Sequence, residues 1–405
     1  MKGRAKRIFQ AVKHRASFYL NMFFFNIFKL FPLKKQTIIF ESEGDYCDNA
    51  FALFSYLRTK KSLDKYKAVW AVVDTSDKCY QKYIHTSVMD KNMYHLNIKA
   101  SYYLATSKFF IYDHNNLYSK LRKRKKQQMI YLSHGRGFKA SKGVDYSKIK
   151  TPFDVMFTTG QIGTEGLSYF WKCDKKMVKE LGYPRNDRFF SDLNHVKNKI
   201  INAYQLHRFN HIFLWMPTFR KTNNQDISED YLNNETGLPL FNGVADIDLF
   251  NLFLAENKIC VLLKVHHLQS DLPIWKKSYS NIRMIKDEEL KRMDIQLYEF
   301  VGICDALITD YSSIAFDYML LDRPIIFTVD DYEAYKKSRG FYPENAIDYM
   351  AGYHIENIDA LKKSFTEICN GQDIYRKDRA KIMPLFFTYT DGYASERILN
   401  YLNID

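Results

Sequence analysis

Short apolar runs alternate with stretches of helical spacing along most of the chain. In the first half, the runs of strand length cover residues 36–42, 67–74, 109–112, 129–135 and 153–160. In the second half, they cover residues 211–219, 258–267, 305–310 and 324–330. Between them, apolar residues recur every three or four positions, as over residues 48–57. This alternation predicts parallel sheets with helices on both faces.

The pattern begins twice, which predicts two α/β domains of similar size with a cleft between them. A charged stretch with helical spacing, about residues 187–209, separates the halves, and a helix near residues 380–403 closes the chain. We therefore expect four parts. They are an N-terminal segment (1–35), a first α/β domain (36–205), a second α/β domain (206–380) and a closing helix (381–405).

The N-terminal segment combines basic residues with an aromatic-rich apolar stripe. Before Glu41 the chain has nine basic residues and no acidic one. Wound as a helix, the segment places its apolar residues on one stripe roughly 100° wide. These residues are Ala5, Ile8, Phe9, Val12, Ala16, Tyr19 and Phe23. Such a pattern is typical of a helix at an acidic membrane surface, whereas the polar breaks at Asn21, Asn26 and Lys29 disfavour a membrane-spanning helix. A helix packed on the protein is the alternative.

Composition narrows the class of protein. The chain has 405 residues, 46% of them hydrophobic, so it can bury substantial cores. Its net charge is +14, and a second basic run covers residues 120–126, which favours an anionic partner, either an acidic membrane or a nucleic acid. The six cysteines form no CxxC pair, which argues for reduced thiols in the cytoplasm and against a zinc ribbon.

A strand-to-helix junction within residues 305–324 offers a place for a phosphate. The apolar run ends at Thr309 and Asp310, and a helical pattern begins after Ser312 and Ser313. Serines at a helix start usually cap its free N–H groups. The same N–H groups and the helix dipole can instead hold a phosphate. The chain has neither a P-loop motif nor a G-x-G-x-x-G motif, so a P-loop NTPase or a dinucleotide enzyme is not favoured.

Two other strand ends carry histidines. His134 follows one apolar run and precedes Gly135, while Lys264 and His266 end another. Ligands of open α/β sheets bind at the carboxyl ends of strands, so we expect these residues to face one cleft. A histidine titrates near neutral pH, which suits it to take a proton from a hydroxyl; a structural role is the alternative for each. No metal-ligand spacing is present, and no metal site is expected.

Three arginines lie beside turn-forming residues. They are Arg185 in LGYPRND, Arg220 in MPTFR and Arg339 in SRGFY. The planar guanidinium fork matches the oxygens of a phosphate. A solvated cation on a surface turn is the alternative for each of them.

Taken in order, these motifs resemble the CDP-glycerol glycerophosphotransferase family of teichoic acid synthesis. The resemblance runs from about residue 36 to about residue 345 and includes ESEGDYCDNAFALFSYL, SHGRGFK, LGYPRND, MPTFR, LLKVHH, TDYSSIAFDYMLLDRPIIF and RGFY. It implies a GT-B-like fold with two Rossmann-like domains. It also implies transfer of glycerol phosphate from CDP-glycerol to a hydroxyl of an undecaprenyl-diphosphate-linked saccharide or a growing polyol-phosphate chain. The resemblance further implies that CMP is released, that no cofactor is needed and that the enzyme works peripherally on the cytoplasmic side of the cell membrane.

The resemblance also implies roles for individual residues. His134, Gly135 and Lys139 match the family's HGT-P-x-K motif, with Arg136 and Gly137 in place of Thr-Pro. His134 is then the base for the attacking hydroxyl. In the K-x-H-P motif, Lys264 and His266 match and His267 replaces the proline, which leaves His266 to assist at the transferred phosphoryl group. Ser312 and Ser313 would hold the donor diphosphate. The other expected substrate-binding residues are Gly135, Lys139, Arg185, Arg220, Lys264, Thr309, Asp310, Asp317 and Arg339.

Several alternatives stay open on the sequence alone. CDP-ribitol can replace CDP-glycerol as donor, and a GT-B glycosyltransferase using a nucleotide sugar would share the fold and the histidine base. A nucleic-acid-binding protein is supported only by charge, because no RNA-binding motif is recognisable, and we expect no nucleic-acid partner. The short length favours a primase that adds the first unit over a polymerase.

Overall fold

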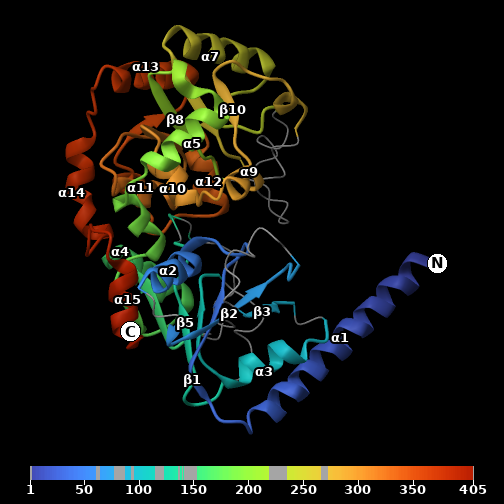
Figure 1. The fold of residues 1–405 in the computed structure, drawn as a ribbon. Helices are drawn as coiled ribbons and strands as arrows, with labels where there is room; N and C mark the ends of the chain where they lie inside the picture. The colour runs from blue at the N-terminus through green and yellow to red at the C-terminus, as the bar shows by residue number, and fades with distance from the viewer. Residues whose placement is uncertain are drawn as a thin grey trace.

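The computed structural model describes residues 2–60, 64–76, 87–92, 95–114, 123–135, 137–138, 140, 153–218, 235–265 and 272–404. Two parallel sheets form the body of the molecule, one in each half of the chain, and helices cover both faces of each (Figure 1). The expected α/β architecture of two parallel sheets is therefore confirmed.

The first domain is built on a seven-stranded parallel sheet of order β3-β2-β1-β4-β5-β6-β7. Its strands are β1 (Lys34–Glu41), β2 (Lys67–Val72), β3 (Ser87–Asp90), β4 (Ser107–Tyr112), β5 (Gln128–Tyr131), β6 (Val155–Thr158) and β7 (Val178–Glu180). One face packs on α2 (Asp48–Thr59), and the other packs on α3 (Ile98–Thr106) and α4 (Gln161–Trp171). The central strands are buried on both faces, which explains their nearly continuous apolar sequences.

The second domain is built on a six-stranded parallel sheet of order β10-β9-β8-β11-β12-β13. Its strands are β8 (His211–Trp215), β9 (Ile259–Leu263), β10 (Ile282–Met284), β11 (Ala306–Thr309), β12 (Ile325–Thr328) and β13 (Tyr353–Ile355). Its α-helices are α5 (Asn194–Tyr204), α7 (Val244–Glu256), α9 (Asp287–Arg292), α10 (Leu297–Gly302), α11 (Ile314–Met319), α12 (Tyr332–Ser338) and α13 (Ile358–Cys369). Short 3₁₀ helices are η5 (Lys175–Met177), η6 (Pro184–Phe190), η7 (Leu206–Arg208), η8 (Pro273–Lys276) and η9 (Ala346–Tyr349).

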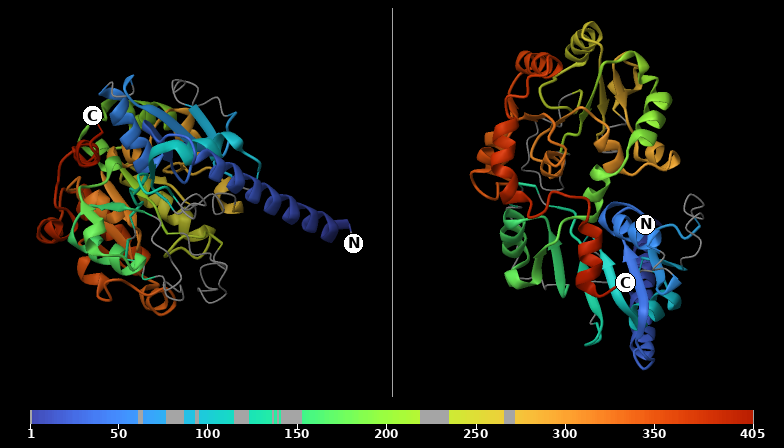
Figure 2. Two further views of the ribbon diagram at one scale, coloured as in Figure 1. Left: turned by 90° about the horizontal axis from the view of Figure 1, so that it is seen from below. Right: turned by 60° about the vertical axis from the view of Figure 1, so that its left-hand side comes forward.

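The prediction of a single closing helix near residues 380–403 is wrong, because the structure has two helices there. These are α14 (Arg376–Phe386) and α15 (Ala394–Leu402). Pro384 lies in the last turn of α14, and the chain is extended after it, where Thr388 N–H donates to the Thr159 carbonyl at 2.8 Å. The chain thereby returns to the first domain (Figure 2). There α15 adds Ile398 to the core of the first sheet.

A 27-residue helix, α1 (Lys2–Phe28), precedes β1 and projects from the body of the molecule (Figure 2). Its inner face packs against α3 and buries Phe25. On the same face Asn21 accepts from the Asn97 N–H at 2.8 Å and donates to the His95 carbonyl at 2.7 Å. These contacts fix how α1 sits on the first domain.

The outer face of α1 carries the apolar stripe that the sequence predicts. Phe9, Val12, Tyr19 and Phe23 are between 58% and 72% exposed. These four side chains of the stripe are therefore largely open to solvent. No helix among the described residues is long and apolar enough to cross a bilayer.

Candidate active site

The loop after β5 carries His134 from the first domain into contact with the second. Gly135 and Gly137 take positive φ values of 76° and 60°, which glycine adopts without strain. A Cβ atom on Gly137 would lie 2.9 Å from the Ser313 backbone nitrogen, so the loop backbone packs directly on the start of α11. Phe138 then enters the hydrophobic core of the second domain. The loop thus connects the carboxyl edges of both sheets.

Two of the sequence motifs meet where the loop after β5 passes from the first domain to the second. The Tyr342 N–H donates to the Phe138 carbonyl at 2.8 Å, and the Ala140 N–H donates to the Gly340 carbonyl at 3.0 Å. The segment before Gly340 brings Arg339, whose Nε is buried and has no hydrogen-bond partner among the described residues. The SHGRGFK and RGFY motifs are therefore neighbours in space.

The His134 imidazole is oriented by a backbone carbonyl. Its Nδ1 lies 3.3 Å from the Asp113 carbonyl oxygen. Because a carbonyl only accepts, this contact favours the tautomer with the proton on Nδ1, and Nε2 keeps a free lone pair. His134 is exposed to solvent, yet the protein around its ring displaces enough water to lower its pKa; the Asp48 charge opposes this shift and the Arg185 charge adds to it. His134 is therefore neutral and able to accept a proton at neutral pH.

The start of α2 holds the His134 loop in place. Asn49 is buried, and its side-chain N–H donates to the Ser133 carbonyl at 2.7 Å. Its side-chain oxygen accepts from the Arg185 backbone N–H at 3.1 Å. The Asp113 carboxylate accepts from the Ala50 N–H at 3.0 Å and so caps α2 from the neighbouring strand end. The three residues at the start of α2, Asp48, Asn49 and Ala50, were not among the predicted site residues.

A buried ion-pair cluster joins the two domains beside this loop. Arg185 donates to Asp317 at 2.7 Å and to Asp48 at 2.8 Å. Asp317 also accepts from Asn186 at 3.0 Å and from the Tyr298 hydroxyl. Burial alone would lower the pKa of Arg185, but the two carboxylates hold it well above its usual value. Arg185 and Asp317, both predicted substrate contacts, thus bind each other here.

Further ionisable groups gather at the carboxyl edge of the first sheet. His114 lies 3.3 Å from the Asp113 carboxylate and 3.5 Å from that of Glu41. Burial raises the pKa of Glu41 and of Asp113. Burial would lower the pKa of His114, but its two carboxylate partners raise it to about 9. The His134 ring therefore lies beside a buried network of charges.

Ser312 and Ser313 begin α11 without capping it. Ser313 occupies the N-cap position, and its side chain forms no capping hydrogen bond. Both serines line a cavity of about 1000 Å³ between the domains. Its wall in the first domain includes Asp48 and Arg185, and in the second domain Met216 and Asp287. The two hydroxyls thus face this cavity, whereas the Ala315 and Phe316 N–H groups of α11 already donate to the Ser312 and Ser313 carbonyls at 3.3 Å and 3.2 Å.

Thr309 and Asp310 lie just before these serines and are fully buried. The Thr309 hydroxyl donates to the Met216 carbonyl at 2.7 Å, and the Asp310 carboxylate accepts from the Thr218 backbone N–H at 2.8 Å. These bonds tie the MPTFR motif to the TDYSS motif. Lys264 forms an ion pair of 2.8 Å with Asp287 on the wall of the same cavity.

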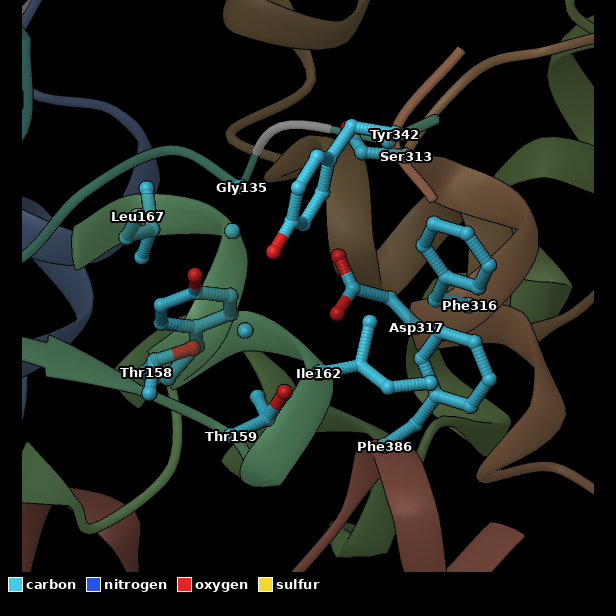
Figure 3. A pocket seen from close by; sticks show the side chains of 14 residues that line it. Gly135, Thr158, Thr159, Ile162, Leu167, Ser313, Phe316, Asp317, Tyr342 and Phe386 are labelled. Atoms are coloured by element: carbon cyan, nitrogen blue, oxygen red, sulfur yellow. The ribbon is translucent and has the colours of Figure 1, made fainter. Parts of the chain in front are cut away.

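A second cavity, of about 590 Å³ with its open mouth, is lined by Asp317. Figure 3 shows Asp317 and Tyr342 reaching into it from the second domain, opposite Thr158 and Ile162 of the first domain. Gly135 of the His134 loop also lines it, and Ser313 lines both cavities.

Three predicted site residues, Lys139, Arg220 and His266, lie outside the described residues. Among the residues that the structure does describe, no group of three or more His, Cys, Asp or Glu side chains could hold a metal ion.

Comparison with known proteins places this geometry in a family. The family model of CDP-glycerol:poly(glycerophosphate) glycerophosphotransferase matches residues 22–403. The teichoic acid poly(ribitol-phosphate) polymerase of Bacillus spizizenii is 25% identical over 400 residues, which cover 94% of this chain and 58% of the relative. The chain thus spans little more than half the length of that relative. The teichoic acid poly(glycerol phosphate) polymerase of the same organism is 27% identical over 78% of this chain and 80% of the relative.

A primase and a solved structure extend the comparison. The teichoic acid glycerol-phosphate primase of Bacillus subtilis is 25% identical, with 78% of each chain covered. The wall teichoic acid polymerase TagF is 21% identical in structure-based alignment, with a TM-score of 0.74 over 99% of this chain and 98% of that chain. The shared fold is GT-B-like. The chain belongs to the CDP-glycerol:poly(glycerophosphate) glycerophosphotransferase family.

Proposed function

We propose that this protein transfers glycerol phosphate from CDP-glycerol to a hydroxyl of a lipid-linked saccharide or of a growing polyol-phosphate chain. The acceptor oxygen bonds to the glycerol-bearing phosphorus, the bond from that phosphorus to CMP breaks, and the hydroxyl proton passes to His134. The observation that carries the proposal is the contact of the loop that bears His134 with the start of α11, where Gly137 packs on the Ser313 backbone and Gly135 lines a cavity together with Ser313. Family membership supports the donor class.

His134 is the proposed general base. Its neutral form and its free Nε2 suit it to take the proton of the attacking hydroxyl. A positioned base of this kind contributes typically ~10²–10⁴-fold. His266 is proposed to assist at the transferred phosphoryl group, on the ground of the sequence resemblance.

The larger interdomain cavity is the proposed donor site. The hydroxyls of Ser312 and Ser313, at the start of α11, would bind the diphosphate by hydrogen bonds. Lys139, Arg220 and Arg339 are proposed as further cations for the phosphates. Thr309, Asp310 and the Arg185–Asp317 pair are proposed to position the loops around the donor, because their polar groups already bind protein atoms. Catalysis then consists largely of positioning and charge stabilisation.

We further propose that α1 lies on the cytoplasmic leaflet and brings the enzyme to its lipid-linked acceptor. The exposed Phe9 and Phe23 on its outer stripe and the basic residues that flank the stripe support this proposal. A chain that starts near Lys34 should then leave the membrane fraction. Its unchanged presence there would contradict the proposal.

Product analysis tests the proposed reaction. The protein is offered CDP-glycerol, CDP-ribitol and UDP-sugars in parallel, each with a short lipid-linked disaccharide, and products are identified by mass. The proposal expects glycerol phosphate added to the acceptor with CMP released. Release of UMP or UDP with sugar transfer would establish a glycosyltransferase instead.

Ribitol transfer is the second candidate. It is favoured by the similarity to the poly(ribitol-phosphate) polymerase of Bacillus spizizenii. The mass of the added unit separates the two polyols, and the number of units added separates a primase from a polymerase.

A further inference from the structure

A cavity lined by cations lies at the amino-terminal edge of the first sheet. It encloses about 1220 Å³ with its open mouth, near the starts of β1, β4 and β5. The basic residues that line it are Lys35, Lys108, Arg124 and Lys126, and no acidic residue of the described chain does so. Its remaining walls include apolar side chains such as Tyr66 and Leu402. The cavity is therefore suited to a ligand with a negative charge and some apolar surface.

Two of the four cations are held in place by backbone carbonyls. Lys108 Nζ donates to the Lys126 carbonyl at 2.7 Å. Arg124 donates to the Phe31 carbonyl at 2.7 Å and to that of Ala105 at 3.3 Å. Neither contact neutralises the charge, because the acceptors are uncharged. Lys35 and Lys126 are exposed and form no ion pair with a carboxylate within the described part of the chain.

Exposed apolar residues adjoin this cavity. Leu30 and Phe31, directly after α1, are 86% and 49% exposed, and Phe31 is the residue whose carbonyl holds Arg124. They continue the apolar surface of α1 to the edge of the cavity. Apolar side chains that enter a bilayer beside cations at headgroup level are the combination that binds an acidic membrane.

We propose that this cavity binds the phosphate of an anionic lipid headgroup. The proposal rests on the membrane association proposed for α1 and gives it a defined headgroup site. The cavity is distinct from the donor site, because the eight residues of β1 separate the two edges of the sheet by roughly 25 Å. The bound protein would stand with the amino-terminal edge of its first sheet on the membrane and with the catalytic opening away from it.

Vesicle binding tests the site with a matched control. The full chain, a Lys35→Gln/Lys126→Gln variant and a Lys377→Gln/Lys381→Gln variant are mixed with vesicles of phosphatidylglycerol and phosphatidylcholine or of phosphatidylcholine alone. The control lysines are exposed on α14 and do not line the cavity, and their substitution removes the same net charge. The cavity variant should lose about 25-fold in affinity for the anionic vesicles, since each lysine near the surface contributes about five-fold. The control variant should change less than two-fold, and CMP release should stay unchanged in both.

The outcomes separate the two membrane proposals. Equal losses in the cavity and control variants would overturn the headgroup site and leave the proposed role of α1 intact. A wild-type chain that binds neither kind of vesicle would overturn both. Vesicle binding does not depend on the transferase reaction. A chain that lacks the proposed activity could therefore still show or fail to show the headgroup site in this experiment.

Discussion

The carboxyl edges of the two sheets face one opening but carry different chemistry. The edge of the first sheet is rich in groups that gain or lose protons, with His134 beside the buried Asp113, His114 and Glu41. The second edge presents hydroxyls and backbone N–H groups at Ser312 and Ser313. In the proposed reaction, proton transfer then belongs to one domain and phosphate binding to the other.

This difference teaches that the contact between the domains is part of the site. A base and a phosphate-binding helix start contribute only when they are aligned. Alignment here depends on the His134 loop, which packs on α11 through Gly137, and on the Arg185–Asp317 pair. Variants can therefore separate three effects, namely domain contact, donor binding and proton transfer.

The largest effect is expected from breaking the buried ion pair. Asp317→Ala leaves the buried Arg185 with Asp48 as its remaining carboxylate and removes the acceptor of Asn186 and of the Tyr298 hydroxyl, so the free energy of unfolding should fall by about 3–5 kcal/mol. Urea unfolding measures this loss. Asp248→Ala, which breaks an exposed pair with Lys277, is the control and should cost less than about 1 kcal/mol. Equal losses in the two variants would contradict the view that the Arg185–Asp317 ion pair stabilises the contact between the domains.

A smaller effect is expected from displacing the His134 loop. Gly137→Ala places a methyl group 2.9 Å from Ser313 N and strains a residue with φ of +60°. Gly371→Ala has a similar φ of +77° but meets nothing within 4 Å, so it reports the backbone strain alone. Gly371→Ala should lose about 1 kcal/mol of stability, and Gly137→Ala should lose more, because its methyl group also meets backbone atoms of the second domain. Only Gly137→Ala should also slow CMP release, by up to ~10²-fold, because it shifts the loop that carries His134. Equal activity in the two variants would contradict this role of the loop.

Donor binding should respond more weakly still. Removing the hydroxyls of Ser312 and Ser313 together should raise the Kd for CDP-glycerol about ten-fold, from two hydrogen bonds of about 1 kcal/mol or less each. The urea midpoint should not move, because Ser313 makes no capping bond in α11. Titration calorimetry measures the affinity, and Ser278→Ala, an exposed serine outside the cavity, is the matched control. An unchanged Kd in the double variant would overturn the donor site.

The smallest expected effect is the position of the acid limb in a pH profile. Burial lowers the pKa of His134 below its usual 6.5. The base is active when neutral, so kcat/KM should fall as the pH drops through that lowered pKa and should be flat just above it. An acid limb centred above pH 6.5 would show that the titrating group is not His134.

The central strands of both sheets could be predicted, because they are buried on both faces and read as continuous apolar runs. The short edge strands β3, β7, β10 and β13 were not predicted, since three or four residues with mixed sequence become strands only through the neighbour with which they pair. The two closing helices were likewise predicted as one helix, because the return of the chain to the first domain depends on a long-range contact.

The site shows the same limit. His134, Ser312 and Ser313 could be predicted because each directly follows a strand, and strand ends of a parallel sheet share one edge. Asn49 was missed because its importance comes from a bond to Ser133, 84 residues away. The partnership of Arg185 with Asp317 spans 132 residues and has no local signal either. Contacts of this kind depend on tertiary packing rather than on spacing in the sequence.

The claim that one domain supplies the base and the other binds the donor is tested most directly with His134→Ala. CMP release and CDP-glycerol binding are both measured for this variant. The account predicts a loss of at least ~10²-fold in turnover with a Kd for donor close to that of the wild type. His195→Ala, an exposed histidine on α5, should leave both values unchanged. Near-wild-type turnover in His134→Ala would contradict the central claim that the first domain supplies the base.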